Sequence, residues 1–251
     1  MNTIYEETKT IRAYDVDFNN RIKISSVFNL LQDVAAVHAD NLGLGFKDLY
    51  KHDFAWVLSW VKLNIERYPS FGDSVTIKTW PRCKFKLYSM RDYSMQDTDG
   101  KILLNATSAW LPINRKTKRI TDTKNLPWEI FYQPDLIAVD EFPDKIITGA
   151  TQEILFHKKF RYTDIDVNQH VNNTRYIEMI LDCYLTDHYK VNQIKSFEIS
   201  FSSESFFDEE IEITRSSGDW FDIIQGTNSK SLKQIFISRI EWGIKNYRTT
   251  I

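Results

Sequence analysis

The chain has 251 residues, of which 42% are hydrophobic, enough for two domains that each bury a core. Its formal net charge of -2 argues against a nucleic-acid partner, which would require a strong basic excess. The sequence shows no secretory signal and no membrane span. The two cysteines, Cys83 and Cys183, are therefore expected to be free thiols in a globular, cytoplasmic protein.

The first half predicts a strand, a polar motif, a helix and four further strands. A strand over residues 8–14 leads into the segment Asp15-Val16-Asp17-Phe18-Asn19-Asn20-Arg21. Apolar residues at helical spacing follow from Val27 to Ala35, with Ser25 or Ser26 as the expected N-cap. Runs rich in Val, Ile, Trp and Tyr then predict strands over 55–65, 74–80, 88–96 and 103–112.

The second half repeats this order after a stretch without periodicity. Residues 128–151 contain Pro134 and Pro143 and are predicted to be a linker. A strand, the second motif, a helix with apolar residues from Tyr176 to Leu185, and four more strands follow. We therefore predict an α+β fold of two domains, residues 1–127 and 152–251, each a curved antiparallel sheet wrapped around a long helix.

The two copies of the motif differ at one informative position. Asp17 aligns with Asp166 and Asn19 with Asn168, but Arg21 stands where the second copy has His170. An imidazole exchanges a proton near neutral pH, whereas a guanidinium stays protonated. The second half is therefore the expected active half, and the first half a partner that has lost its chemistry.

Three other interpretations of the second motif compete with a catalytic one. A calcium loop is excluded, because Val171 stands where that loop needs glycine and Ile177 where it needs a bidentate Glu. A transition-metal site is disfavoured, because Asn is a poor ligand and no second His or Cys is near. Capping of a turn and a helix explains Asp17 and Asn19, and part of the role of Asp166. It leaves unexplained why carboxylate, amide and imidazole meet at a helix start, where free N–H groups suit an oxyanion.

The second motif resembles a known family. The segment from Asp166 to Asn173, followed by Tyr176-Ile177, is similar to the catalytic Asp-x-Asn-x-His-Val-Asn-Asn segment of the acyl–acyl carrier protein thioesterases of plastids and bacteria. The segment Phe201-Ser202-Ser203-Glu204-Ser205-Phe206-Phe207-Asp208 resembles a second family segment, in which plant members carry Cys at the position of Ser205. The resemblance covers nearly the whole chain and implies tandem hotdog domains, in agreement with the repeat.

The resemblance implies hydrolysis of the thioester of a fatty acyl–acyl carrier protein, with no cofactor and no metal. Its catalytic residues would be Asp166, Asn168, His170 and Glu204. Glu204 would activate water, Asn168 and His170 would position water and thioester, and Asp166 would orient them. Amides near the helix start would stabilise the oxyanion, and a Ser205 nucleophile is not expected.

The resemblance also implies where substrate and partner bind. The expected acyl-pocket and substrate-binding residues are Val27, Leu30, Leu31, Val34 and Asn173. An acidic carrier protein would need a local basic patch, for which Arg115, Lys116, Lys118 and Arg119 are favoured over Lys158, Lys159 and Arg161. An acyl-CoA thioesterase, a hotdog dehydratase and a non-catalytic acyl-binding protein remain as alternatives, and a homodimer remains open.

Overall fold

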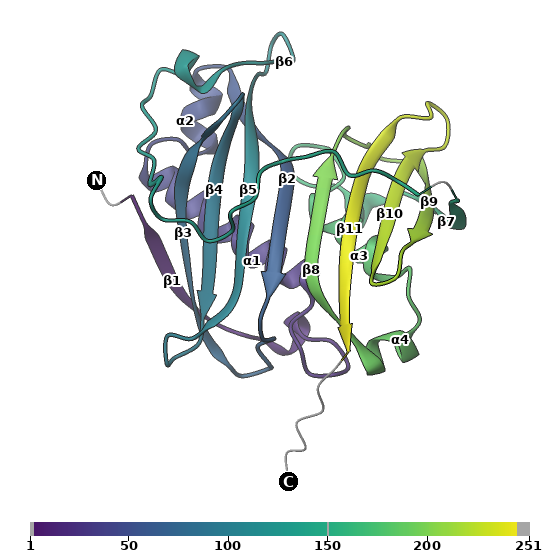
Figure 1. The fold of residues 1–251 in the computed structure, drawn as a ribbon. Helices are drawn as coiled ribbons and strands as arrows, with labels where there is room; N and C mark the ends of the chain where they lie inside the picture. Colours follow the sequence, from purple (N-terminus) through teal and green to yellow (C-terminus); the bar gives the residue numbers. More distant parts are fainter. Residues whose placement is uncertain (1–2, 150, 245–251) are drawn as a thin grey trace. The chain divides into compact units, whose positions relative to one another are not determined.

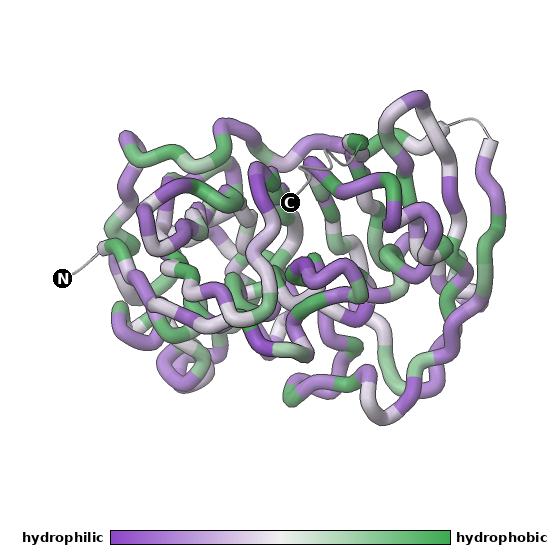
Figure 2. Tube along the Cα trace, turned by 90° about the horizontal axis from the view of Figure 1, so that it is seen from below, coloured by the Kyte–Doolittle hydropathy of each residue, from purple (hydrophilic) through white to green (hydrophobic). Residues whose placement is uncertain are grey.

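The computed structural model describes residues 3–149 and 151–244. The chain divides into two compact units, Met1–Asp144 and Lys145–Ile251. Apolar and polar stretches alternate along both, as Figure 2 shows. In the described part of the chain, no helix is both long and apolar enough to cross a membrane.

The first unit consists of an antiparallel sheet and one long helix (Figure 1). The sheet order is β1-β3-β4-β5-β2, and β6 pairs with the end of β5. In chain order the elements are β1 (Tyr5–Thr10), η1 (Ala13–Asp15), α1 (Ile24–Asn41), α2 (Phe46–Lys51), β2 (Phe54–Ile65), β3 (Ser74–Phe85), β4 (Tyr88–Gln96), β5 (Ile102–Asn114), β6 (Arg119–Ile120) and η2 (Thr123–Asn125).

Helix α1 packs its apolar stripe on the sheet. Val27, Leu31 and Val34 are buried, at the spacing that brings side chains to one face of a helix. The expected cap is wrong: the helix begins at Ile24 with Lys23 as N-cap, and Ser25 and Ser26 are buried in its first turn. The apolar stripe also begins earlier than predicted, because Ile24, the first helical residue, is buried one turn before Val27 and Phe28.

A strap of residues 133–142 covers the opposite face of this sheet (Figure 1). Successive side chains of a strand point to opposite faces, so Arg91 faces α1 and Asp92 faces the strap. Asp92 accepts the backbone N–H of Ala138 at 2.8 Å, and Arg82 donates to the carbonyls of Val139 and Glu141. Arg82 and Asp92 are 2% and 0% exposed. The strap therefore closes over a buried pair of charges.

The second unit has the same plan. Its sheet order is β8-β11-β10-β9-β7, with all neighbours antiparallel. In chain order the elements are β7 (Glu153–Lys159), η3 (Tyr162–Asp164), α3 (Asn173–Leu181), α4 (Thr186–Val191), β8 (Asn192–Phe201), β9 (Glu210–Ser217), β10 (Phe221–Asn228) and β11 (Gln234–Ile244).

Tyr176 lies at the centre of this unit's core. It is 2% exposed, and its ring packs against Phe160, Phe201 and Phe236 with centroid separations of 5.9, 6.2 and 5.3 Å. These contacts fix α3 on the sheet. Each unit is thus a helix packed on an antiparallel sheet, as the α+β prediction stated.

Helix α3 is shorter than its apolar pattern predicted. It ends at Leu181, and Leu185, expected on the helix, is 83% exposed. Tyr184 turns instead toward the sheet, where its hydroxyl donates to Asp222 at 3.0 Å and its ring packs against Trp242. Tertiary contacts of this one aromatic side chain override the local helical pattern.

Candidate active site

The two motifs form the same loop. The N–H of Asp166 donates to the carbonyl of His170 at 2.8 Å, and that of Gln169 donates to the carbonyl of Asp166 at 3.0 Å. Asp17 and Arg21 repeat the first bond at 2.8 Å, and Asn20 repeats the second at 3.0 Å. Gln169 and Asn20 have φ values of 66° and 56°, which is uncommon for residues other than glycine. The backbone has therefore kept one conformation in both units.

In each unit, a backbone hydrogen bond joins the motif loop to the segment that follows the next long strand, β2 in the first unit and β8 in the second. Val171 donates its N–H to the carbonyl of Ser205 at 2.9 Å, and Ile22 donates to the carbonyl of Pro69 at 2.9 Å. The residue before each of these carbonyls, Glu204 or Tyr68, therefore occupies the equivalent position. The sequence aligns only the two motifs. These hydrogen bonds show that Glu204 and Tyr68 also occupy equivalent positions.

The equivalent positions carry different chemistry. In the second unit, Nε2 of His170 lies 3.3 Å from Oε2 of Glu204. In the first unit, the guanidinium carbon of Arg21 lies 5.7 Å from the centre of the Tyr68 ring. A histidine and a carboxylate can exchange a proton with a substrate or water, whereas an arginine stacked on a tyrosine cannot.

Glu204 reaches His170 because strand β8 ends at Phe201. Strict alternation along the strand would have directed residue 204 away from the inward side chains, but the irregular segment after Phe201 removes that constraint. The side chains of His170 and Glu204 are 25% and 48% exposed. Water and a substrate can therefore reach the pair.

Asp166 contacts backbone rather than catalytic side chains. Its Oδ1 accepts the N–H of Asn168 at 2.8 Å and that of His170 at 3.4 Å. Asp17 makes the same two bonds, to Asn19 and Arg21. The contacts of Asp166 are those of a turn-forming residue, and they orient His170 through its backbone. Asn168 is exposed on this loop.

The start of α3 offers one amide for an oxyanion. Asn172 is the N-cap, and its side-chain oxygen accepts the N–H and the hydroxyl of Thr174 at 2.9 and 2.7 Å. The N–H of Asn172 donates to Asp164, and that of Arg175 donates to the carbonyl of Asn172. Among these first amides, all in the described part of the chain, only that of Asn173 lacks an acceptor. Of the amides expected near 172–174, only the backbone N–H of Asn173 is thus free to donate to an oxyanion, and it lies at the positive end of the helix dipole.

An open hollow of about 900 Å³ adjoins the loop. The ring of Phe206, which lines it, packs edge-on against His170 at 5.1 Å. Aromatic and polar side chains share the walls, so the hollow can accept a partly polar ligand beside the motif loop, although neither His170 nor Glu204 lines it. Its lining residues are Tyr162, Thr163, Ile165, Asp166, Gln169, Arg175, Phe206 and Phe207.

Ser205 is unsuited to act as a nucleophile. It is 0% exposed, and among the described residues its hydroxyl has no hydrogen-bond partner. A serine attacks only when a base can take its proton. Its neighbour Tyr176 cannot serve, because burial raises the pKa of the phenol.

Helix α1, which carries the predicted acyl-pocket residues, also contacts a buried polar cluster that the sequence analysis did not predict. Leu30 is half-buried, and Val27, Leu31 and Val34 are buried on α1. On the same face of the sheet, Arg91 lies 3.0 Å from Nδ1 of His38 and donates to Thr79 at 3.1 Å. Burial lowers the pKa of Arg91. The alternation of Arg91 with Tyr93 and Met95 was the sequence signal that could have placed this guanidinium inside.

The predicted docking residues follow the end of β5. The guanidinium of Arg115 stacks on Tyr50 at 3.7 Å, and Lys116 forms an ion pair with Asp53 at 2.5 Å. Lys118 is exposed in the turn to β6, and Arg119 is exposed as the first residue of β6. The four residues thus share one surface region with α2.

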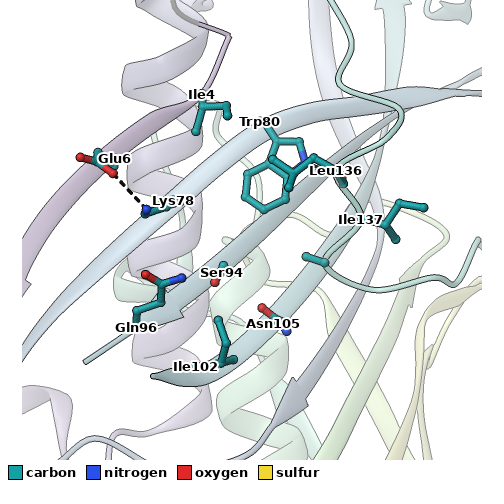
Figure 3. A pocket seen from close by; sticks show the side chains of 11 residues that line it. Ile4, Glu6, Lys78, Trp80, Ser94, Gln96, Ile102, Asn105, Leu136 and Ile137 are labelled. Carbon is teal, nitrogen blue, oxygen red and sulfur yellow. Dashed lines mark hydrogen bonds and ion pairs between the residues drawn. The ribbon is translucent and has the colours of Figure 1, made fainter. Parts of the chain in front are cut away.

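A second hollow, of about 610 Å³, lies on the strap face of the first unit (Figure 3). The strap residues Leu136 and Ile137 line one side, and Trp80 and Lys78 of β3 line another. It contains none of the predicted site residues. In the described part of the chain, no group of three or more His, Cys, Asp or Glu is arranged to hold a metal ion.

Comparison with known proteins first defines the class. An acyl-ACP thioesterase from Bacteroides thetaiotaomicron has a crystal structure that superposes with a TM-score of 0.89 at 26% identity, covering 96% of this chain and 98% of that one. A 12:0-ACP thioesterase from Umbellularia californica superposes with a TM-score of 0.78 at 23% identity, covering 98% and 99%. The fold is that of these thioesterases, and the predicted tandem hotdog class is confirmed.

The family follows from the sequence. Residues 2–128 match the acyl-ACP thioesterase N-terminal domain, and residues 149–246 match the C-terminal domain. The chain therefore belongs to the acyl-ACP thioesterase family.

Curated relatives from plants agree with this assignment. A palmitoyl-acyl carrier protein thioesterase of Cuphea hookeriana is 30% identical over 80% of this chain and 52% of its own length. An acyl-[acyl-carrier-protein] hydrolase of Cuphea viscosissima is 29% identical over 80% of this chain and 52% of its length. The chain thus spans about half the length of these relatives.

Proposed function

We propose that this protein hydrolyses the thioester of a fatty acyl–acyl carrier protein, releasing free fatty acid and so ending chain elongation. The observation that carries the proposal is the His170–Glu204 pair, with Nε2 and Oε2 at 3.3 Å, on a loop whose copy in the first unit lacks both groups. Family membership supports the thioester substrate. In this proposal Glu204, and not a metal ion or cofactor, activates the water.

In the proposed mechanism, Glu204 accepts a proton from water as the water attacks the thioester carbonyl. The amide of Asn173 then stabilises the oxyanion, and collapse of the intermediate breaks the C–S bond. The thiolate of the phosphopantetheine arm leaves and takes up the proton. His170 and Asn168 position water and substrate, and Asp166 holds their loop through its backbone contacts.

The acyl chain is proposed to lie against α1 of the first unit, along Val27, Leu30, Leu31 and Val34. Three of these residues are buried in the core, so the chain would enter by displacing packed side chains. We propose that the catalytic residues belong to a domain of residues 152–251 and the acyl pocket to a domain of residues 1–127. The contacts of the strap with the first sheet favour a boundary at residue 144, so that most of the predicted linker belongs to the first unit.

The partner is proposed to be an acidic acyl carrier protein that docks at Arg115, Lys116, Lys118 and Arg119. A cytoplasmic location remains part of the proposal, consistent with the free thiols of Cys83 and Cys183. The relatives named above, in contrast, are described as chloroplastic. Whether the protein forms a homodimer can be tested by measuring its mass by analytical ultracentrifugation at the enzyme concentration of the assay.

The test is release of fatty acid from acyl carrier protein and acyl-CoA thioesters of graded chain length. We expect carrier-protein substrates to be preferred, and Glu204→Gln, His170→Ala and Asn168→Ala to lower kcat by about 10²–10⁴-fold. Ser205→Ala is the matched control and should be nearly silent. Preference for CoA would support an acyl-CoA thioesterase, and full activity of Glu204→Gln would refute water activation by that residue.

A further inference from the structure

A patch of aromatic and basic side chains lies at one end of the first unit, where α2 meets the turn after β5. Phe46 and Tyr50 of α2 are 60% and 51% exposed, and their ring centres are 5.8 Å apart. Leu49, on the opposite side of this short helix, is 1% exposed. Because residues four apart lie on one face of a helix, Phe46, Lys47, Tyr50 and Lys51 share the side that faces solvent.

The turn after β5 extends this surface. Arg115 stacks its guanidinium on Tyr50 at 3.7 Å, so the turn and the helix form one continuous face. We define the α2 patch as Phe46, Lys47, Tyr50, Lys51, Arg115, Lys116, Lys118 and Arg119.

The charges of the α2 patch are unevenly compensated. Lys116 is paired with Asp53 at 2.5 Å, and Lys51 with Asp48 at 3.5 Å. Lys47, Arg115, Lys118 and Arg119 have no carboxylate within ion-pair distance among the described residues. Most protein surfaces mix charges of both signs and cover large aromatic rings. A surface with four unpaired cations and two exposed rings is therefore unusual and indicates a binding site.

The approach of α2 to the sheet is fixed by the chain that precedes it. A Cβ on Gly45, the N-cap of α2, would lie 1.6 Å from Oδ1 and 2.9 Å from the backbone Cα of Asp40. The indole N–H of Trp56 donates to the carbonyl of Leu44 at 3.2 Å. Helix α2 is therefore held rigidly, and a rigid surface loses little entropy when it binds a partner.

We infer that the α2 patch is the docking surface for the carrier protein, with the rings of Phe46 and Tyr50 as its apolar centre. The inference rests on the proposed function and extends its docking site from the β5–β6 turn to α2. The partner that fits is an acidic surface that presents carboxylates to Lys47, Lys118 and Arg119 and an apolar side chain to Tyr50. Lys116 contributes less, because Asp53 already neutralises it.

The inference is tested by steady-state hydrolysis of two thioesters of the same acyl chain, one with carrier protein and one with pantetheine. Lys47→Glu and Arg119→Glu should each raise the KM for the carrier-protein substrate about tenfold at low salt, and less at high salt. Tyr50→Ala should raise it similarly, whereas Tyr50→Phe, which keeps the ring under Arg115, should not. The pantetheine thioester has no protein to dock, so its hydrolysis should change by less than about twofold.

The matched control is Lys101→Glu, because Lys101 precedes β5 and Arg115 follows it. The two residues therefore lie at opposite ends of one strand, and Lys101 has an exposed side chain. If wild-type enzyme hydrolyses the carrier substrate but Lys47→Glu and Lys101→Glu behave alike, the α2 patch is refuted and the proposed function stands. If wild type hydrolyses no thioester, the proposed function fails. Titration of labelled holo-carrier protein then decides the docking surface, which is refuted if Lys47→Glu binds as tightly as wild type.

Discussion

The common backbone of the two motif loops predicts that the pair of the second unit can be replaced by that of the first. The double substitution His170→Arg with Glu204→Tyr would place the Arg21–Tyr68 pair on the second loop. All the hydrogen bonds that define the loop use backbone atoms or the carboxylate of Asp166. The substitution leaves each of them in place.

The expected effect on stability is small. The His170–Glu204 contact is partly exposed and contributes about 0–1 kcal/mol, while an exposed cation–π contact contributes about 0.5–1 kcal/mol. The side chain of Glu204 is 48% exposed, so a larger tyrosine at this position can extend toward solvent. The free energy of unfolding should therefore change by less than about 1 kcal/mol, a shift in Tm of less than about 8 °C.

The expected effect on catalysis is large. Neither arginine nor tyrosine can take a proton from water at neutral pH, so kcat should fall by about 10²–10⁴-fold, or about 3–5 kcal/mol in activation free energy. Thermal unfolding and single-turnover hydrolysis of an acyl carrier protein thioester measure the two effects. A folded variant that keeps turnover within tenfold of wild type would refute the role of the pair, and a variant that does not fold would refute the shared backbone frame.

Three further outcomes follow from other parts of the molecule. Arg21→Ala should change stability or KM by more than it changes single-turnover rate, and a selective loss of that rate would contradict a non-catalytic first loop. Burial raises the pKa of Cys183 to about 12. At pH 8 its alkylation should therefore be at least 100-fold slower than that of a free thiol. Peptide mass spectrometry measures the rate, and rapid labelling would contradict the expectation. Burial lowers the pKa of His188, so the folded protein binds fewer protons than the unfolded one, and stability should fall as pH drops below about 6.5. His188→Gln should flatten this dependence in thermal unfolding scans, and an unchanged slope would exclude His188 as its source.

Local patterns were sufficient for the central strands of the first sheet but not for its first strand, because β1 covers Tyr5–Thr10 instead of the predicted 8–14 and the chain forms a 3₁₀ helix at Ala13–Asp15. The strand predicted over 88–96 is β4 within the same bounds, and the strand predicted over 103–112 differs from β5 by one or two residues at each end. Strand β3 is longer than the predicted 74–80 and continues through Pro81 to Phe85. The sheet accommodates that proline at an irregularity in register between Pro81 and Lys84, one of the places where a strand tolerates proline.

The contacts between distant segments could not be predicted from local patterns. Glu204 was associated with His170 through family resemblance, and its alignment with Tyr68 became visible through the bonds of Val171 and Ile22. The distance along the chain from motif to partner differs between the halves, so no fixed spacing marks the pair. Helix α2 was also missed, because six residues are too few to show a helical period.

The strap has a consequence for how this chain can be divided and recombined. A cut at residue 127 would remove the carbonyls of Val139 and Glu141 and the amide of Ala138 from Arg82 and Asp92, and would expose this face of the sheet to water. The loss of these contacts, together with the apolar surface that the strap now buries, would destabilise the unit. A gene fusion or domain exchange that carries the first unit into another protein should therefore include the chain through Phe142, whose ring packs on Phe85 and under Arg82. The transferable segment is longer than the sheet and helix that define the fold.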